Sequence, residues 1–130
     1  MKKITGLIIL GLVIIGTASE VNARQIGEFS SFKVNYSGSE KFTGYLTKAT
    51  TGRNGVVNLS NDTGTAWITA NMKNSEGAYR GGTTVQRGKR AEFKTSNAVA
   101  GYKYRMGMRK TNDTGGGSVT IKGSWSPDSH

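Results

Sequence analysis

The residues best suited to acid–base chemistry are two aspartates in a repeated Asn-Asp-Thr-Gly tetrapeptide, at 61–64 and 112–115. Two carboxylates that share a proton across an apolar-flanked loop form the catalytic pair of aspartic proteases. Here an asparagine precedes each aspartate, Asp62 and Asp113, and such polar neighbours favour a turn over a buried loop. We therefore predict that both copies are solvent-exposed hairpin turns and that neither aspartate is catalytic.

The sequence lacks the residues that other common catalytic mechanisms require. The chain has no cysteine, and its one histidine, His130, is the last residue of the sequence. A Ser-His-Asp triad needs an oriented imidazole, and a zinc site needs several His or Cys ligands. The number of acidic residues is sufficient for a carboxylate pair of the kind that glycosidases use. Glu92, however, shares a predicted strand face with Arg90 and Lys94, which favours a surface ion pair. We predict no catalytic residue, no metal, no cofactor and no enzyme activity.

The N-terminus has the pattern of a secretory signal peptide. Lys2 and Lys3 precede a nearly unbroken apolar run over 4–15, and Val21-Asn22-Ala23 offers small or modest residues at a cleavage site. The run is shorter than the ~20 residues of a membrane span. We predict a signal peptide over 1–23 and a secreted, extracellular domain over 24–130, with an uncleaved anchor as the alternative. The absence of cysteine excludes a lipoprotein and suits a Gram-positive exterior.

Basic residues outnumber acidic ones by 18 to eight, and the excess is concentrated. Residues 80–110 hold nine basic residues and one acidic residue. Such a field attracts anionic partners, which for an exported protein are an anionic polymer of the cell envelope or a membrane surface. The predicted anion-binding residues cluster if the strands near 82–95 and 101–110 are neighbours, as sequential strands often are. These residues are Arg87, Lys89, Arg90, Lys94, Lys103, Arg105 and Arg109.

The elements that must position these residues are strands. Over 101–110, Tyr102, Tyr104, Met106 and Met108 alternate with the cations, so this segment is predicted to be half-buried with a cationic outer face. Further strands are predicted at 32–36, 41–48, 54–60, 65–73, 82–87, 89–95 and 117–125, with turns at 51–55, 61–64, 74–77 and 112–115. Seven or eight short strands predict an all-β domain, a single small antiparallel β-sandwich or barrel-like fold.

The aromatic residues are predicted to serve the core. The tyrosines of 101–110 share a face with methionines rather than with the cations, so they are not placed as platforms for stacked bases. We therefore expect no dedicated nucleic-acid binding. Trp67 and Trp125 are also expected in the core, with a role as interfacial anchors as the alternative.

Several short motifs resemble a family. The chain is similar to small secreted Gram-positive proteins of unknown function in five segments. They are Val56-Val57-Asn58-Leu59, Gly64-Thr65, Tyr104-Arg105-Met106-Gly107, Ser118-Val119 and the closing Gly123-Ser124-Trp125-Ser126-Pro127-Asp128. Genes of that family often lie beside bacteriocin-type export genes. The resemblance covers about 42–128 and implies a secreted β-domain with a possible link to antimicrobial peptides. It implies no catalytic residues.

The sequence thus favours a secreted, non-enzymatic, basic β-sandwich that acts at the bacterial cell envelope by binding anionic polymers or lipids. A bacteriocin-like antimicrobial protein, or its accessory or immunity protein, is the first alternative. A small extracellular enzyme is the second. The sequence leaves the ligand and the oligomeric state open.

Overall fold

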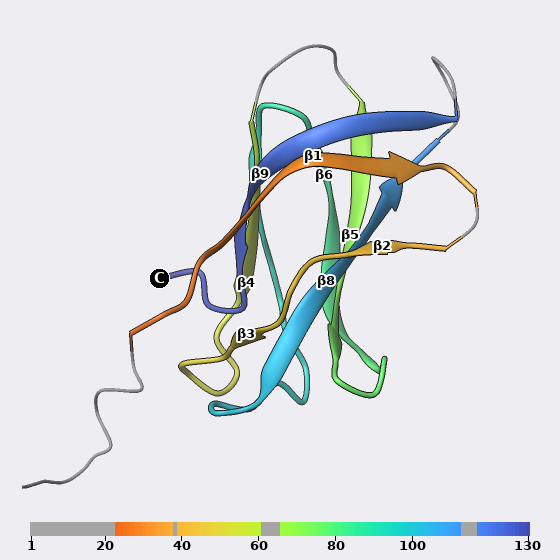
Figure 1. Ribbon diagram of the computed structural model, residues 1–130. Helices are drawn as coiled ribbons and strands as arrows, with labels where there is room; N and C mark the ends of the chain where they lie inside the picture. The colour runs from red at the N-terminus through yellow and green to blue at the C-terminus, as the bar shows by residue number, and fades with distance from the viewer. Residues whose placement is uncertain (1–22, 38, 61–65, 113–116) are drawn as a thin grey trace, which may run out of the picture.

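The computed structural model describes residues 23–37, 39–60, 66–112 and 117–130, which form nine strands (Figure 1). The strands are β1 (Gly27–Asn35), β2 (Lys41–Phe42), β3 (Leu46–Thr47), β4 (Gly55–Leu59), β5 (Trp67–Asn74), β6 (Tyr79–Gln86), β7 (Arg90–Phe93), β8 (Lys103–Lys110) and β9 (Ser118–Ser126). Among the described residues there is no helix, and hence none able to cross a membrane. All of the predicted signal peptide except Ala23 lies outside the described residues.

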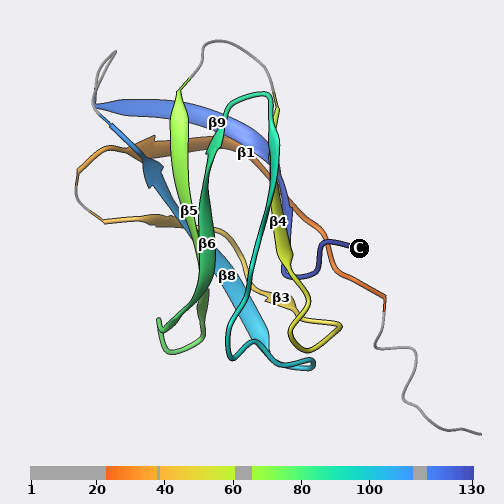
Figure 2. The ribbon, with the colours of Figure 1, turned by 180° about the vertical axis from the view of Figure 1, so that it is seen from behind.

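The strands form two antiparallel sheets that pack against each other (Figures 1 and 2). One sheet has the order β1-β9-β4-β7, and the other has the order β2-β8-β5-β6, with β3 also paired to β8. The prediction of an all-β sandwich is confirmed, and the fold is not a closed barrel. The predicted strand over 41–48 is two short strands, because the chain between Phe42 and Leu46 leaves the ladder with β8. This division accounts for nine strands in place of the seven or eight expected.

The core lies between the sheets and is built by the alternation that the sequence predicts. Ile68 and Met72 of β5 face inward together with Tyr104, Met106 and Met108 of β8, and all five are at most 3% exposed. The other sheet contributes Phe32, Val34, Val57, Ile121 and Trp125. Burying a side chain of this size is worth about 1.5–3 kcal/mol, so these two inner faces hold the sheets together.

Two aromatic residues differ from the prediction of a core position. Tyr102 is 66% exposed, because β8 begins one residue later and the backbone turns at Gly101, where φ is +90°. Trp67 is 45% exposed, because its neighbour Ile68 takes the inward position on β5. Trp125 is buried as expected, at 2% exposed.

The predicted turns at 51–55 and 74–77 are confirmed. Gly52 and Gly77 have φ values of +78° and +85°, which glycine adopts without strain. In the second turn, the Asn74 side-chain oxygen accepts hydrogen bonds from the backbone N–H groups of Glu76 and Ala78. The predicted turn at 61–64 and residues 113–115 of the fourth lie outside the described residues.

Candidate anion-binding face

The seven predicted anion-binding residues lie in two separate places. Strand β8 carries Lys103, Arg105 and Arg109, whereas the other four lie from the end of β6 to just after β7. The condition for a single cluster is not met, because β5 lies between β8 and β6 and because β7 belongs to the other sheet. The physical reason is the path of the chain, which passes from one sheet to the other between β6 and β7 and returns between β7 and β8.

The three cations of β8 point outward, and β5 adds a fourth. Directly paired residues of an antiparallel ladder share a face of the sheet. Lys73 of β5 pairs with Arg105, so these two cations lie side by side on the outer surface. We call the surface formed by Lys73, Lys103, Arg105 and Arg109 the cationic face. Lys73 is not among the residues predicted from the sequence, because nothing in the sequence specifies the register between β5 and β8.

Two aromatic rings hold the Arg105 side chain on this face. The guanidinium carbon lies 4.0 Å from the ring centre of Phe42 and 5.0 Å from that of Tyr45, within the range of cation–π attraction. Both rings come from the short β2–β3 segment and stay partly exposed. The Phe42 ring fits because Gly107 lies beneath it: a Cβ atom at this position would be 2.7 Å from the ring. The missing side chain of Gly107 therefore makes room for the aromatic cover over Arg105.

Glu40 is the acidic member of the surface. Its carboxylate accepts hydrogen bonds from Lys73 Nζ at 2.5 Å and from Asn71 Nδ2 at 2.8 Å. Burial alone would raise the pKa of Glu40. The hydrogen bonds from Lys73 and Asn71, together with the positive charges of Lys73 and Arg109, outweigh burial and hold the pKa below its ordinary value. Glu40 is thus ionised at neutral pH and offsets the charge of Lys73. Lys103, Arg105 and Arg109 form no ion pair with a described carboxylate, although Glu40 also feels the charge of Arg109.

The other predicted anion-binding residues form a separate candidate site. Arg90 donates a hydrogen bond to Glu92 at 3.0 Å, which confirms the predicted surface ion pair. Lys89 and Arg90 line an open cleft of about 360 Å³ beside Trp67. Lys94 is exposed just after β7. Glu92 neutralises Arg90, so this cation is less available to a ligand than the outward cations of β8.

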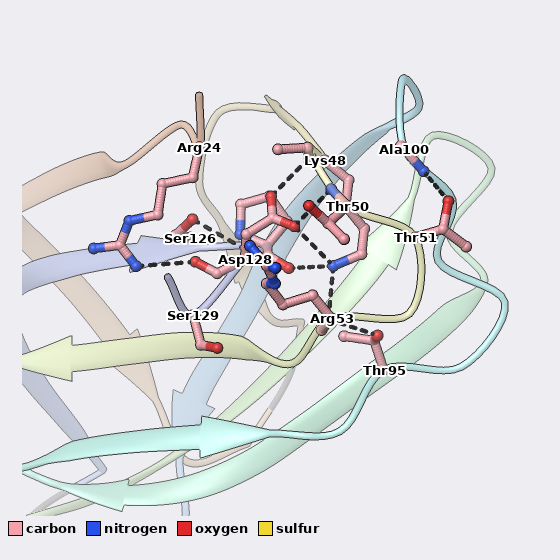
Figure 3. Close-up of polar contacts among 12 residues, drawn as sticks. Arg24, Lys48, Thr50, Thr51, Arg53, Thr95, Ala100, Ser126, Asp128 and Ser129 are labelled. Atoms are coloured by element: carbon pink, nitrogen blue, oxygen red, sulfur yellow. Dashed lines mark hydrogen bonds and ion pairs between the residues drawn. The ribbon is translucent and has the colours of Figure 1, made fainter. Parts of the chain in front are cut away.

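A buried ion pair at the C-terminal segment was not predicted (Figure 3). Lys48 Nζ lies 3.3 Å from Asp128 Oδ1, and both side chains are fully buried. The ammonium also donates to the carbonyls of Arg53 and Pro127, at 2.7 and 2.5 Å. The Asp128 carboxylate accepts from the backbone N–H groups of Ala49 and Thr50, at 2.7 and 3.0 Å. Burial lowers the pKa of Lys48, and the attraction of Asp128 opposes this effect.

This ion pair has a structural role. The three ammonium protons and both carboxylate oxygens have partners, so no group is left to act on a ligand. The pair fastens the segment after β9 to the residue that follows β3. Figures 1 and 2 show this segment beside the start of β4 and the N-terminal end of the domain. Asp128 belongs to the closing Ser126-Pro127-Asp128 motif noted in the sequence. Its partner Lys48 could not be identified, because it lies 80 residues earlier in the chain.

Metal ligands, the two aspartates and the histidine were the other candidates from the sequence. They contain no group of three or more His, Asp or Glu side chains arranged to hold a metal ion. Asp62 and Asp113 lie outside the described residues, so their prediction as turn residues is untested. The imidazole of His130 is within 3.2 Å of the neighbouring Ser129 hydroxyl.

The fold and this surface define the chain as an all-β sandwich with a cationic, aromatic-supported sheet face. No protein-family model, curated protein or solved structure matches the chain. The functional argument therefore rests on the residues of the cationic face.

Proposed function

We propose that this protein is an exported, non-enzymatic β-sandwich that binds anionic components of the bacterial cell envelope through its cationic face. The observation that carries the proposal is the outward placement of Lys103, Arg105 and Arg109 along β8. Seven residues of extended strand span about 20 Å, so these charges form a line rather than a point. Such a line attracts a long polyanion or a charged surface more strongly than it attracts a small ion.

Binding to phosphate-bearing polymers or anionic lipids is tested with purified protein comprising residues 24–130, which include all nine strands. We expect it to bind phosphate-bearing wall polymer, or vesicles containing phosphatidylglycerol in phosphatidylcholine, and not vesicles of phosphatidylcholine alone. Binding should weaken steeply between about 50 and about 500 mM salt, because the Debye length falls from above about 10 Å to a few Å. Co-sedimentation at several salt concentrations measures this dependence.

Two triple variants with equal charge loss locate the binding surface. Lys103→Gln, Arg105→Gln and Arg109→Gln together remove three charges from the cationic face. Lys89→Gln, Lys94→Gln and Lys122→Gln remove three exposed charges from elsewhere and serve as the control.

Only the first triple variant should lose most of the binding. Circular dichroism should show that both variants remain folded, because all six side chains lie at the surface or point outward. Equal losses in the two variants would contradict a role for this particular face. The absence of binding by the parent protein at low salt would contradict the proposed function as a whole.

A further inference from the structure

Arg105 differs from the other cations of the face because its side chain is held in place without a polar partner. Its guanidinium lies against Phe42 and Tyr45, and its buried Nε has no hydrogen-bond partner. It forms no ion pair with any described residue. Buried polar groups nearly always find a partner, and fixing a long side chain usually costs conformational entropy. An arginine held in this way is prepared to bind an external group.

The geometry selects the chemical class of that group. A guanidinium presents a planar fork of N–H donors that matches phosphate or carboxylate oxygens in a bidentate manner. Lys103 lies two residues from Arg105 along β8, about 7 Å away, on the same face of the strand. A tetrahedral phosphate can direct its oxygens toward more than one of these cations at once. A planar carboxylate uses both of its oxygens on the fork.

The two rings indicate what surrounds the phosphate. Phe42 and Tyr45 are 37% and 40% exposed, so part of each ring remains available beside the guanidinium. Exposed aromatic surface next to a phosphate site suits the carbon skeleton of a sugar or polyol. Both rings already pack on Arg105, so they are not free side chains projecting for insertion into a bilayer.

We propose that Arg105, Phe42 and Tyr45 form a binding site for the phosphodiester groups of a sugar- or polyol-phosphate polymer. The inference rests on the proposed function and specifies its ligand. The polymer lies along β8, with one phosphodiester on the Arg105 fork and its neighbours near Lys103 and Arg109. The line of charges favours this linear ligand over a lipid bilayer.

The test compares two polyanions at one ionic strength, about 0.15 M. Isothermal titration measures binding of a glycerol-phosphate polymer and of a polyglutamate chain of similar length. The parent protein should bind the phosphate polymer about tenfold more tightly, because only phosphate engages the fork and the neighbouring cations together.

Arg105→Lys keeps the charge but removes the fork and its stacking on the rings. This variant should lose about tenfold in affinity for the phosphate polymer and little for polyglutamate. Arg90→Lys is the matched control, because Arg90 is an exposed arginine of β7, in the other sheet and outside the cationic face. It should change either affinity less than about twofold. Tyr45→Ala, which leaves β8 and Gly107 unchanged, should weaken phosphate binding in the same direction as Arg105→Lys.

The outcomes separate this site from the general proposal. Equal affinity for both polymers, or full binding by Arg105→Lys, would overturn the phosphodiester site while leaving anion binding intact. Tighter binding to phosphatidylglycerol vesicles than to the glycerol-phosphate polymer would overturn the choice of a polymer. If the parent protein binds neither polymer nor vesicles at low salt, the proposed function fails and this site fails with it.

Discussion

Replacing Asp128 by asparagine removes a negative charge from a place that solvent does not reach. The side chains of Asp128 and Lys48 are both fully buried, with 3.3 Å between Nζ and Oδ1. Two backbone N–H groups also point at the carboxylate, those of Ala49 and Thr50. An asparagine keeps the size and one acceptor oxygen. Its NH₂ group must then face either a backbone N–H group or the Lys48 ammonium, which places donor against donor.

The size of the effect follows from these contacts. Breaking a buried ion pair by removing one partner costs about 3–5 kcal/mol, because the other charge is left without compensation. We therefore expect Asp128→Asn to lower the free energy of unfolding by about 3 kcal/mol or more. Lys48→Met should cost less, because Asp128 keeps both backbone donors. The double variant should be more stable than the two separate losses predict, with a coupling energy of about 1 kcal/mol or more.

Urea unfolding followed by tryptophan fluorescence measures these differences. Trp125 is buried in the strand that leads into this segment, whereas Trp67 is half-exposed, so a Trp67→Phe background isolates the informative signal. In thermal unfolding, a loss of about 3 kcal/mol corresponds to a fall in Tm of about 12 °C or more. Glu92→Gln is the control, because its ion pair with Arg90 is exposed and its loss should leave Tm nearly unchanged. An Asp128→Asn variant within about 1 kcal/mol of the parent would refute the reasoning.

Three further predictions concern other parts of the chain. Gly123→Ala should destabilise the domain by about 1–3 kcal/mol, because its Cβ would lie 2.0 Å from the Asn58 carbonyl oxygen. Gly117→Ala is the control: its Cβ meets open space, so it should lower the free energy of unfolding far less in the same urea titration. Because the pKa of Glu40 is lowered from 4.5 in the folded protein, its carboxylate stabilises the fold above about pH 4.5. This contribution is lost as the pH falls through the lowered pKa, and Glu40→Gln should flatten this part of the stability–pH curve. Mass spectrometry of the exported protein should find an N-terminus within about two residues of Arg24, and full-length protein confined to the membrane fraction would contradict this.

The strands were predictable because alternation is a local property. In β8, the order of Tyr104, Met106 and Met108 fixes which residues enter the core, and it also sends Arg105 and Arg109 outward. The pattern fails at positions where a strand begins or where the chain leaves the ladder. Tyr102 continues the alternation that places Tyr104 and Met106 in the core, but it precedes β8 and is exposed to solvent.

The partners across strands could not be predicted. Lys73 joins Arg105, and Glu40 reaches Lys73, through pairings between segments about 30 residues apart in the sequence. The Lys48–Asp128 pair joins positions 80 residues apart. Alternation says which face a side chain occupies but not which strand lies beside it. The assumption that sequential strands are neighbours therefore gave an incorrect single cluster.

Strand parity also limits how much of the positive charge is available to a partner. Lys110 directly follows Arg109 in β8, yet it pairs with the inward-facing Ile68 and is only 3% exposed. Lys48 is buried against Asp128, and Lys73 is offset by Glu40. A net charge of +10 for the whole chain thus overstates the charge that an anionic ligand meets. Binding should follow the few outward cations of β8, so variants of equal net charge differ in affinity according to which face they alter.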